Sequence, residues 1–136
     1  MPGPRAAARA DAHRSGGLPG RSVAMLRFEA ARCPMALPAE EVLRLAPEPP
    51  GGEVIAAVDL DARFGGTGAS GPWLQWRRGA STRWLRVDRV VEVFSCEVRS
   101  LRPMPAWLRA RGQAGPFWAV GVREQEVFLL VDPARL

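Results

Sequence analysis

The feature that most constrains the fold of this chain is the run of β-branched residues at positions 87–94, VDRVVEVF. Valine-rich segments favour extended chain over helix, and successive side chains of a strand point to opposite faces. One face of this strand is therefore predicted to be core and the other mixed. The predicted core face holds Leu85, Val87, Val91 and Val93, and the mixed face holds Arg86, Asp88, Val90, Glu92 and Phe94. Because Arg89 interrupts the core face, we expect the strand to twist or bulge there and let the guanidinium group reach solvent.

The segments on either side of this run are its expected partners. Short alternating or apolar runs separated by turn residues predict three hairpins, which pair residues 23–29 with 32–37, 73–78 with 82–94, and 117–122 with 127–131. Both strands of the last hairpin are predicted to be buried. The remaining predicted elements are a buried core strand at 53–60, a flexible glycine-rich linker at 65–71, and helical turns at 38–45 and 105–111. Many short strands and two minor helices predict an all-β fold, barrel-like or sandwich-like.

The charge of the chain is unevenly distributed. The net charge is +5 over 136 residues, and four arginines against one aspartate place +3 of it in residues 1–21. That segment has almost nothing to bury, so we predict a disordered tail at 1–21 and one domain at 22–136. A native start near Val23 or Met25 and a functional basic arm are the two interpretations of the tail.

Residues able to carry out catalysis are scarce. His13 is the only histidine and lies in the predicted tail, so no catalytic triad or histidine metal site is expected, and the chain is not predicted to be an enzyme. Cys33 and Cys96 are far apart, which predicts two free, buried thiols. We expect no cofactor and no metal. No apolar run approaches the roughly 18 residues of a membrane helix, so a cytoplasmic protein without membrane insertion is expected.

Tryptophan and arginine are concentrated in the second predicted hairpin. Residues 73–89 contain Trp73, Trp76, Arg77, Arg78, Arg83, Trp84, Arg86 and Arg89, with Asp88 as the only acid. Aromatic rings interleaved with arginines can stack on bases and contact phosphates, so a small β-barrel that binds nucleic acid is one hypothesis. Trp and Arg also dominate the energetics of protein–protein interfaces. Because residues 22–136 carry a net charge of only about +2, a protein-binding face is the favoured interpretation.

Several short motifs follow one another in a recognisable order. They are MLRFE at 25–29, ALPAEEV at 36–42, VDL at 58–60, VDRV at 87–90, LRP at 101–103, VGV at 120–122 and VFLLVDPARL at 127–136. Their order and spacing over residues 23–136 resemble those of CheW-like domains, the coupling modules of bacterial chemosensory arrays. The resemblance implies two small five-stranded, SH3-like β-barrel lobes around a hydrophobic core, with short helical turns.

The same resemblance implies a function and a set of contact residues. A CheW-like domain is a non-enzymatic adaptor between the cytoplasmic tip of a chemoreceptor and the regulatory domain of a CheA-type histidine kinase. The positions that match family contacts are Val42, Leu45, Asp88, Val90 and Arg102. Plain core packing is the alternative interpretation of Val42, Leu45 and Val90. Residues 47–53 replace a longer family segment with an NLRG-type motif, so the resemblance implies a shortened, divergent member without the usual receptor-coupling arginine.

Overall fold

Two β-sheets form the body of the protein in the computed structural model, which describes residues 21–48, 57–110 and 115–136. The six-stranded sheet has the order β7-β1-β2-β10-β9-β8, and we call it the first lobe. Its strands are β1 (Ser22–Ala30), β2 (Cys33–Pro38), β7 (Arg89–Glu97), β8 (Arg102–Pro103), β9 (Phe117–Arg123) and β10 (Glu126–Val131). The four-stranded sheet, the second lobe, has the order β3-β5-β6-β4. Its strands are β3 (Val42–Ala46), β4 (Ala57–Asp59), β5 (Trp73–Arg78) and β6 (Ser81–Arg86).

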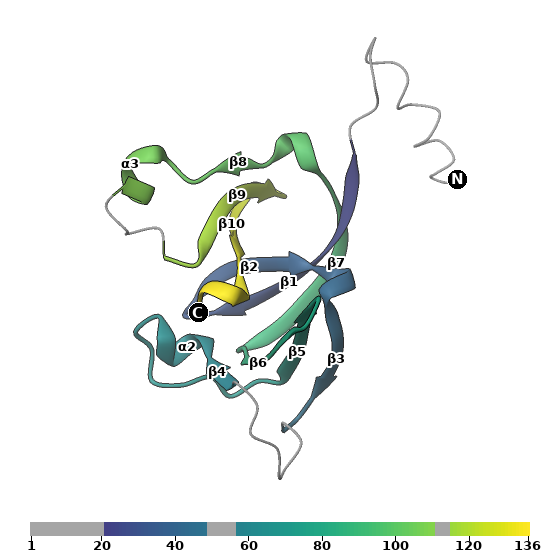
Figure 1. Ribbon diagram of the computed structural model, residues 1–136, viewed down its shortest axis with the longest axis vertical. Coiled ribbons are helices and arrows are strands. Elements are labelled where there is room, and N and C mark those ends of the chain that lie inside the picture. Colours follow the sequence, from purple (N-terminus) through teal and green to yellow (C-terminus); the bar gives the residue numbers. More distant parts are fainter. Residues whose placement is uncertain (1–20, 49–56, 111–114) are drawn as a thin grey trace, which may run out of the picture.

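Short helical turns connect the strands. They are η2 (Ala39–Glu41), α2 (Leu60–Arg63), η3 (Val98–Ser100), α3 (Ala106–Ala110) and η4 (Pro133–Arg135). In Figure 1 the first lobe lies above and the second lobe below, and β1, β2 and β7 are the strands of the first lobe that lie nearest the second. The all-β prediction with two lobes and short helical turns is therefore confirmed. No helix among the described residues is long and apolar enough to span a membrane.

All three predicted hairpins are present, although the second strand of the middle one ends at Arg86 and not at Phe94. β1 pairs with β2, β5 with β6, and β9 with β10, each in antiparallel register. Two of the turns use left-handed backbone at residues other than glycine: φ is 52° at Ala31 and 62° at Arg32, and 52° at Glu124 and 70° at Gln125. Two successive left-handed residues match the twist of the flanking strands, which is why a two-residue turn closes each hairpin.

The run at 87–94 is not one continuous strand, contrary to the prediction. β6 ends at Arg86 in the second lobe, and β7 begins at Arg89 in the first lobe. Val87 and Asp88 form the crossover between the lobes, held by hydrogen bonds from Val87 N to Pro72 O (3.1 Å) and from Asp88 N to Glu29 O (2.8 Å). The chain therefore moves between sheets at the centre of its most strand-like segment.

The predicted faces of this run are also partly wrong. The register of β1 with β7 shifts between Arg27 and Phe28, which leaves Val91 as an extra residue on β7. A bulge of this kind resets the alternation of side chains. Val93 is consequently 60% exposed and Phe94 only 7%. Arg89 does reach solvent, as expected, with its side chain 65% exposed and paired with Glu29; the bulge itself lies two residues further along.

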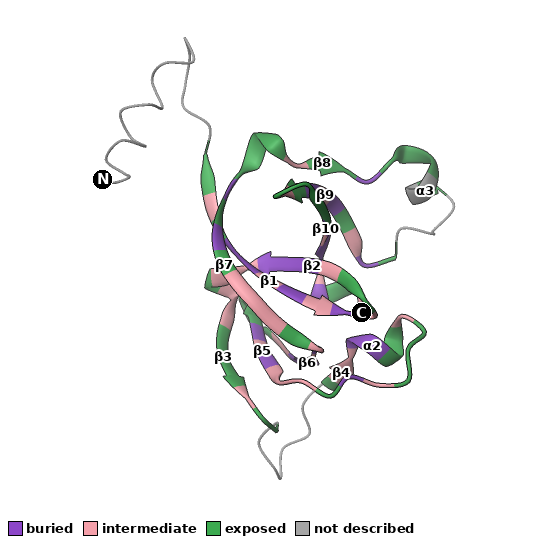
Figure 2. Cartoon of the chain, turned by 180° about the vertical axis from the view of Figure 1, so that it is seen from behind, coloured by how far each residue is buried: buried purple, intermediate pink, exposed green. Residues whose placement is uncertain are grey.

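Two clusters of buried side chains make up the core. The larger one joins the lobes, because Phe28, Met35 and Leu37 of the first lobe pack with Leu74 and Trp76 of the second. The smaller one lies within the first lobe and is built from Met25, Ala36, Phe94, Cys96, Ala119, Phe128 and Leu130. Figure 2 shows buried positions, in purple, on strands of both lobes. Since the lobes share one core, they form a single body.

Some other sequence predictions need correction. Residues 38–45 contain only one 3-10 turn, η2, and Val42 onward is strand β3, because pairing with β5 replaces helix there. In the predicted core strand, residues 53–56 lie outside the described residues, Ala57 is exposed, and Leu60 is buried in α2.

The third hairpin and the cysteines also differ from expectation. The third hairpin is not buried on both faces, since Val122 is 68% and Val127 56% exposed. Cys33 is exposed and only Cys96 is buried, although both are free thiols. The predicted helix at 105–111 is confirmed at Ala106–Ala110, and residue 111 lies outside the described residues.

Candidate interaction surfaces

The first two predicted contact residues lie on β3, an edge strand of the second lobe. Among the described residues β3 pairs only with β5, in a register that places Val42 opposite Trp76 and Leu45 opposite Leu74. Val42 is half-buried and packs against the larger core, which agrees with core packing for that residue. Leu45 is 49% exposed, and its neighbour Leu43 is 50% exposed. Strand β3 therefore presents two leucines to solvent beside a free edge, and Figure 2 shows this strand mostly in green.

Asp88, Val90 and Arg102 lie in other parts of the fold. Val90, on β7, is half-buried against the larger core. Arg102 is exposed on β8, at the opposite end of the sheet order from β7, and donates a hydrogen bond to Arg99 O at 2.9 Å. The five predicted residues are thus spread over the edge of the second lobe, the crossover and both end strands of the first lobe.

The environment of Asp88 is acidic. Burial in the crossover raises the pKa of its carboxyl group, and the charges of Asp61, Asp59 and Glu29 raise it further. Glu92, which the sequence placed beside Asp88 on the mixed face, instead turns its carboxylate to Arg27 and Arg123 within the first lobe. Of the two carboxylates at 87–94, Asp88 therefore lies between the lobes. Glu92 lies within the first lobe and does not share a face with Asp88.

A second apolar surface, on the first lobe, was missed by sequence reasoning. Val122 and Val127 pair directly across β9 and β10, and Val93 on β7 is also more than half exposed. The unbroken apolar runs of these strands predicted burial on both faces. The exposed face has no signature in the sequence, because only the position of a strand in the sheet decides whether its second face is covered.

The tryptophan- and arginine-rich hairpin is not an open stacking platform. Trp76 and Trp84 are fully buried. The Cζ of Arg78 lies 5.1 Å from the ring centroid of Trp76, and that of Arg44 lies 5.3 Å from the ring of Trp84. These rings are therefore covered by arginine side chains of the same chain and are not available to bases, which contradicts the arrangement that the nucleic-acid hypothesis requires.

One of these arginines ties the two lobes together at the surface. Arg78 of β5 pairs with Glu41 of η2 (Nε–Oε2 3.1 Å) and with Asp132, which follows β10 (Nη1–Oδ1 3.0 Å). Glu41 also accepts a hydrogen bond from the Trp76 indole at 2.8 Å. The hydrogen bond to Glu41, together with the two negative charges, raises the pKa of the Arg78 guanidinium. This cluster supports the fixed orientation of the lobes that their shared core imposes.

The glycine-rich segment at 65–71 is held in place by two aspartates and is not a freely flexible linker. Asp59 accepts hydrogen bonds from Ala69 N (2.9 and 3.0 Å), and Asp61 accepts one from Gly68 N (2.8 Å). A Cβ at Gly66 would lie 2.1 Å from the Asp61 carboxylate, so a larger residue there would displace the side chain that holds the loop. A hollow of about 390 Å³ lies between this loop and the β1–β2 turn. Among the described residues, no three His, Cys, Asp or Glu side chains are placed to hold a metal ion.

The chain is an all-β protein of two lobes on one shared core, and strands of each lobe carry exposed aliphatic side chains. The fold is CheW-like. The chain superposes on the scaffolding protein TtCheW from Thermoanaerobacter tengcongensis with a TM-score of 0.65 and 17% sequence identity, covering 82% of this chain and 89% of that one. No family model matches the sequence, and no curated protein matches it.

Proposed function

We propose that the protein is a non-enzymatic scaffold that couples a chemoreceptor to a CheA-type histidine kinase in bacterial chemosensory signalling. The observation that carries this proposal is the CheW-like fold across 82% of the chain, shared with a protein described as a scaffold. The sequence motifs that resemble CheW-like domains point the same way. The sequence departs from the family pattern in one respect, since it lacks the NLRG-type motif that is linked to receptor coupling.

The arrangement of exposed residues suits a scaffold with two faces. Leu45 and Leu43 are exposed on the second lobe, whereas Val93, Val122 and Val127 are exposed on the first. Because both lobes pack on one core, partners bound to the two faces would be held at a constant separation. Individually weak contacts gain strength when they are repeated in an array, so neither face needs to bind tightly by itself.

The five predicted contact residues have different roles in this proposal. We assign Leu45 to the kinase face, because it combines exposure with a free strand edge. Arg102 and Asp88 are assigned as polar contacts, because Arg102 is exposed and Asp88 is half-buried. Val42 and Val90 pack against the larger core and hold their strands in place. The receptor tip is the second partner, bound without the usual arginine.

The direct test is binding of the purified chain to the regulatory domain of the CheA-type kinase from the same organism, measured by calorimetry. Leu45→Ser should weaken binding by about tenfold, as expected for truncating an exposed apolar anchor of an interface. The matched control is Val127→Ser, which removes an aliphatic side chain of similar exposure from the other lobe and should leave kinase binding unchanged. Thermal unfolding of both variants checks that each remains folded.

Two results would overturn this proposal. One is failure of the unmodified chain to bind the regulatory domain, and the other is an equal loss of affinity in both variants. Kinase binding should change little with moderate salt. Tight oligonucleotide binding that falls steeply with salt would instead identify a nucleic-acid protein.

A further inference from the structure

The first lobe has a seam between β7 and the end of β9. β8 is only two residues long and pairs with β9 at Val120 and Ala119. Beyond Val120, residues 121–123 of β9 have no backbone partner on that side among the described strands, and β7 pairs only with β1. Side chains nevertheless meet across the gap, since the Cζ of Arg123 lies 4.7 Å from the Phe94 ring centroid. We call this gap, between β7 and residues 121–123, the seam.

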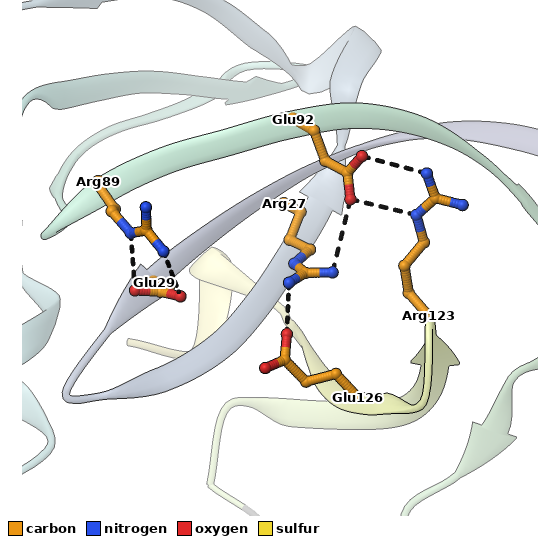
Figure 3. Close-up of polar contacts among 6 residues, drawn as sticks. All are labelled: Arg27, Glu29, Arg89, Glu92, Arg123 and Glu126. Carbon is orange, nitrogen blue, oxygen red and sulfur yellow. Dashed lines mark hydrogen bonds and ion pairs between the residues drawn. The ribbon is translucent and has the colours of Figure 1, made fainter.

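A network of four charged side chains bridges the seam (Figure 3). Glu92 of β7 accepts hydrogen bonds from Arg123 Nε (3.2 Å) and Nη2 (3.1 Å) at the end of β9. The same carboxylate accepts one from Arg27 Nη1 of β1 at 3.5 Å, and Arg27 in turn pairs with Glu126 at the start of β10. The network therefore joins β1, β7, β9 and β10 where the backbone ladder between β7 and β9 is missing.

The network also covers one end of the smaller core. Successive side chains of a strand alternate between its two faces, and each member of the network lies two positions from a buried residue of the same strand. The network therefore lies on the inner face of these strands. The buried residues are Met25, Phe94, Gly121 and Phe128, next to Arg27, Glu92, Arg123 and Glu126 respectively. The side chain of Arg27 is only 11% exposed, and its Nε is buried without a hydrogen-bond partner among the described residues. Its charge is therefore balanced mainly by Glu92 and Glu126, and the loss of either would be costly.

The electrostatics agree with this geometry. Hydrogen bonding to Arg123 lowers the pKa of the Glu92 carboxyl, and the same contact raises the pKa of the Arg123 guanidinium. Three of the four side chains are accessible to salt, with exposures of 28% for Glu92, 34% for Arg123 and 50% for Glu126. Salt screens exposed charges over about 10 Å at 0.1 M and about 3 Å at 1 M.

We propose that the Arg27–Glu92–Arg123–Glu126 network is an ionic latch on the seam, which opens more often as the ionic strength rises. Opening separates the β9–β10 hairpin from β7 and exposes the end of the smaller core at Phe94 and Phe128. Since side-chain contacts and no backbone ladder among the described strands close the seam, the free energy of local opening depends on those contacts. The ion pairs are the part of them that salt weakens. The latch is a property of the isolated chain and does not depend on the proposed scaffold role.

The chain contains a matched control for this proposal. Arg89 makes two hydrogen bonds to Glu29, at 2.9 and 3.1 Å, so this pair resembles the Glu92–Arg123 pair in geometry (Figure 3). It joins β1 to β7, however, which are already paired along their length. Removing it takes away an ion pair without releasing a seam.

The experiment is hydrogen–deuterium exchange of the full-length chain, read by mass spectrometry at 0.05 M and 1 M NaCl. Glu92→Gln should accelerate exchange of peptides covering β7 and the β9–β10 hairpin by about tenfold at low salt, as expected for sub-global opening. Glu29→Gln should leave those peptides within about twofold of the unmodified chain, as expected for a surface ion pair. High salt should accelerate the same peptides in the unmodified chain and add little in Glu92→Gln.

Three results would overturn the proposal. The two variants change the exchange rates equally, or Glu92→Gln accelerates exchange in the second lobe as much as in the β9–β10 hairpin. The third is that salt has no effect on exchange of the peptides covering β7 and the β9–β10 hairpin. If Glu92→Gln does not fold, Glu126→Gln provides the second variant. It removes the more exposed partner of Arg27 and leaves the Glu92–Arg123 pair in place. It should accelerate the same peptides to a smaller extent, and no acceleration would contradict the latch.

Discussion

A methyl group added at Gly71 would test the crossover between the lobes most directly. In Gly71→Ala the new Cβ would lie 2.0 Å from Asp88 O and 2.5 Å from Val87 O, whereas ordinary contact begins at 3.4 Å. The two backbones would have to separate by about 1.4 Å. That movement would disturb the hydrogen bonds of Val87 N to Pro72 O and of Asp88 N to Glu29 O. Overpacking a rigid site costs about 1–3 kcal/mol, and a clash with backbone belongs at the upper end, near 3 kcal/mol.

The control for this variant is Gly79→Ala in the β5–β6 turn. A Cβ at Gly79 meets nothing within 4 Å, but the residue has a φ of +59°. Its cost is therefore the left-handed backbone alone, about 1 kcal/mol. Because Gly71 does not have such a φ, the comparison separates close approach from backbone conformation.

Urea unfolding, followed by the fluorescence of the buried Trp76 and Trp84, measures both variants. For an m-value of about 1.5 kcal/mol/M, the midpoint should fall by about 2 M in Gly71→Ala and by about 0.7 M in Gly79→Ala. An equal or smaller shift for Gly71→Ala would refute the idea that the crossover depends on close backbone contact.

Three further outcomes are expected. Phe128→Ala, which empties the centre of the smaller core beside Phe94, should lower the free energy of unfolding by about 3–5 kcal/mol in the same urea assay. The pKa of Asp88 is raised in the folded protein, so the free energy of unfolding falls as the pH rises from 3.8, the ordinary pKa, through the folded-state pKa. Asp88→Asn should therefore be more stable than the unmodified chain at pH 7. This difference in the free energy of unfolding should shrink by pH 3. A thiol reagent should modify Cys33 but not Cys96 in the native protein, giving one equivalent before and two after denaturation, and two native equivalents would contradict the burial of Cys96.

Much of the local structure was predictable because it depends on residues close together in the chain. The three hairpins followed from short alternating or apolar runs on either side of a turn. The turn of the first hairpin was predicted at residues 30–31 and lies one residue further along, at Ala31 and Arg32, and its left-handed backbone was not predicted. The order of the motifs led to the CheW-like fold, which the structural likeness supports.

The candidate surfaces were predictable only in part. Leu45 and Arg102 proved accessible, whereas Val42 and Val90 pack against the core. The helical propensity of residues 42–45 was overridden by pairing with β5, which contributes long-range hydrogen bonds that local propensity does not include.

What this sequence determined by itself is the three hairpins and the order in which they follow, because a hairpin depends on the side-chain chemistry of residues close together in the chain. The tertiary structure alone decided that residues 87–94 would leave one sheet at Arg86 and enter the other at Arg89. It also decided, through the bulge at Val91, that Phe94 would be buried in place of Val93. The physical reason is the same in each case: burial and ion pairing depend on the strands that lie alongside, and Glu92 acquires Arg27 and Arg123 as partners only when distant parts of the chain meet.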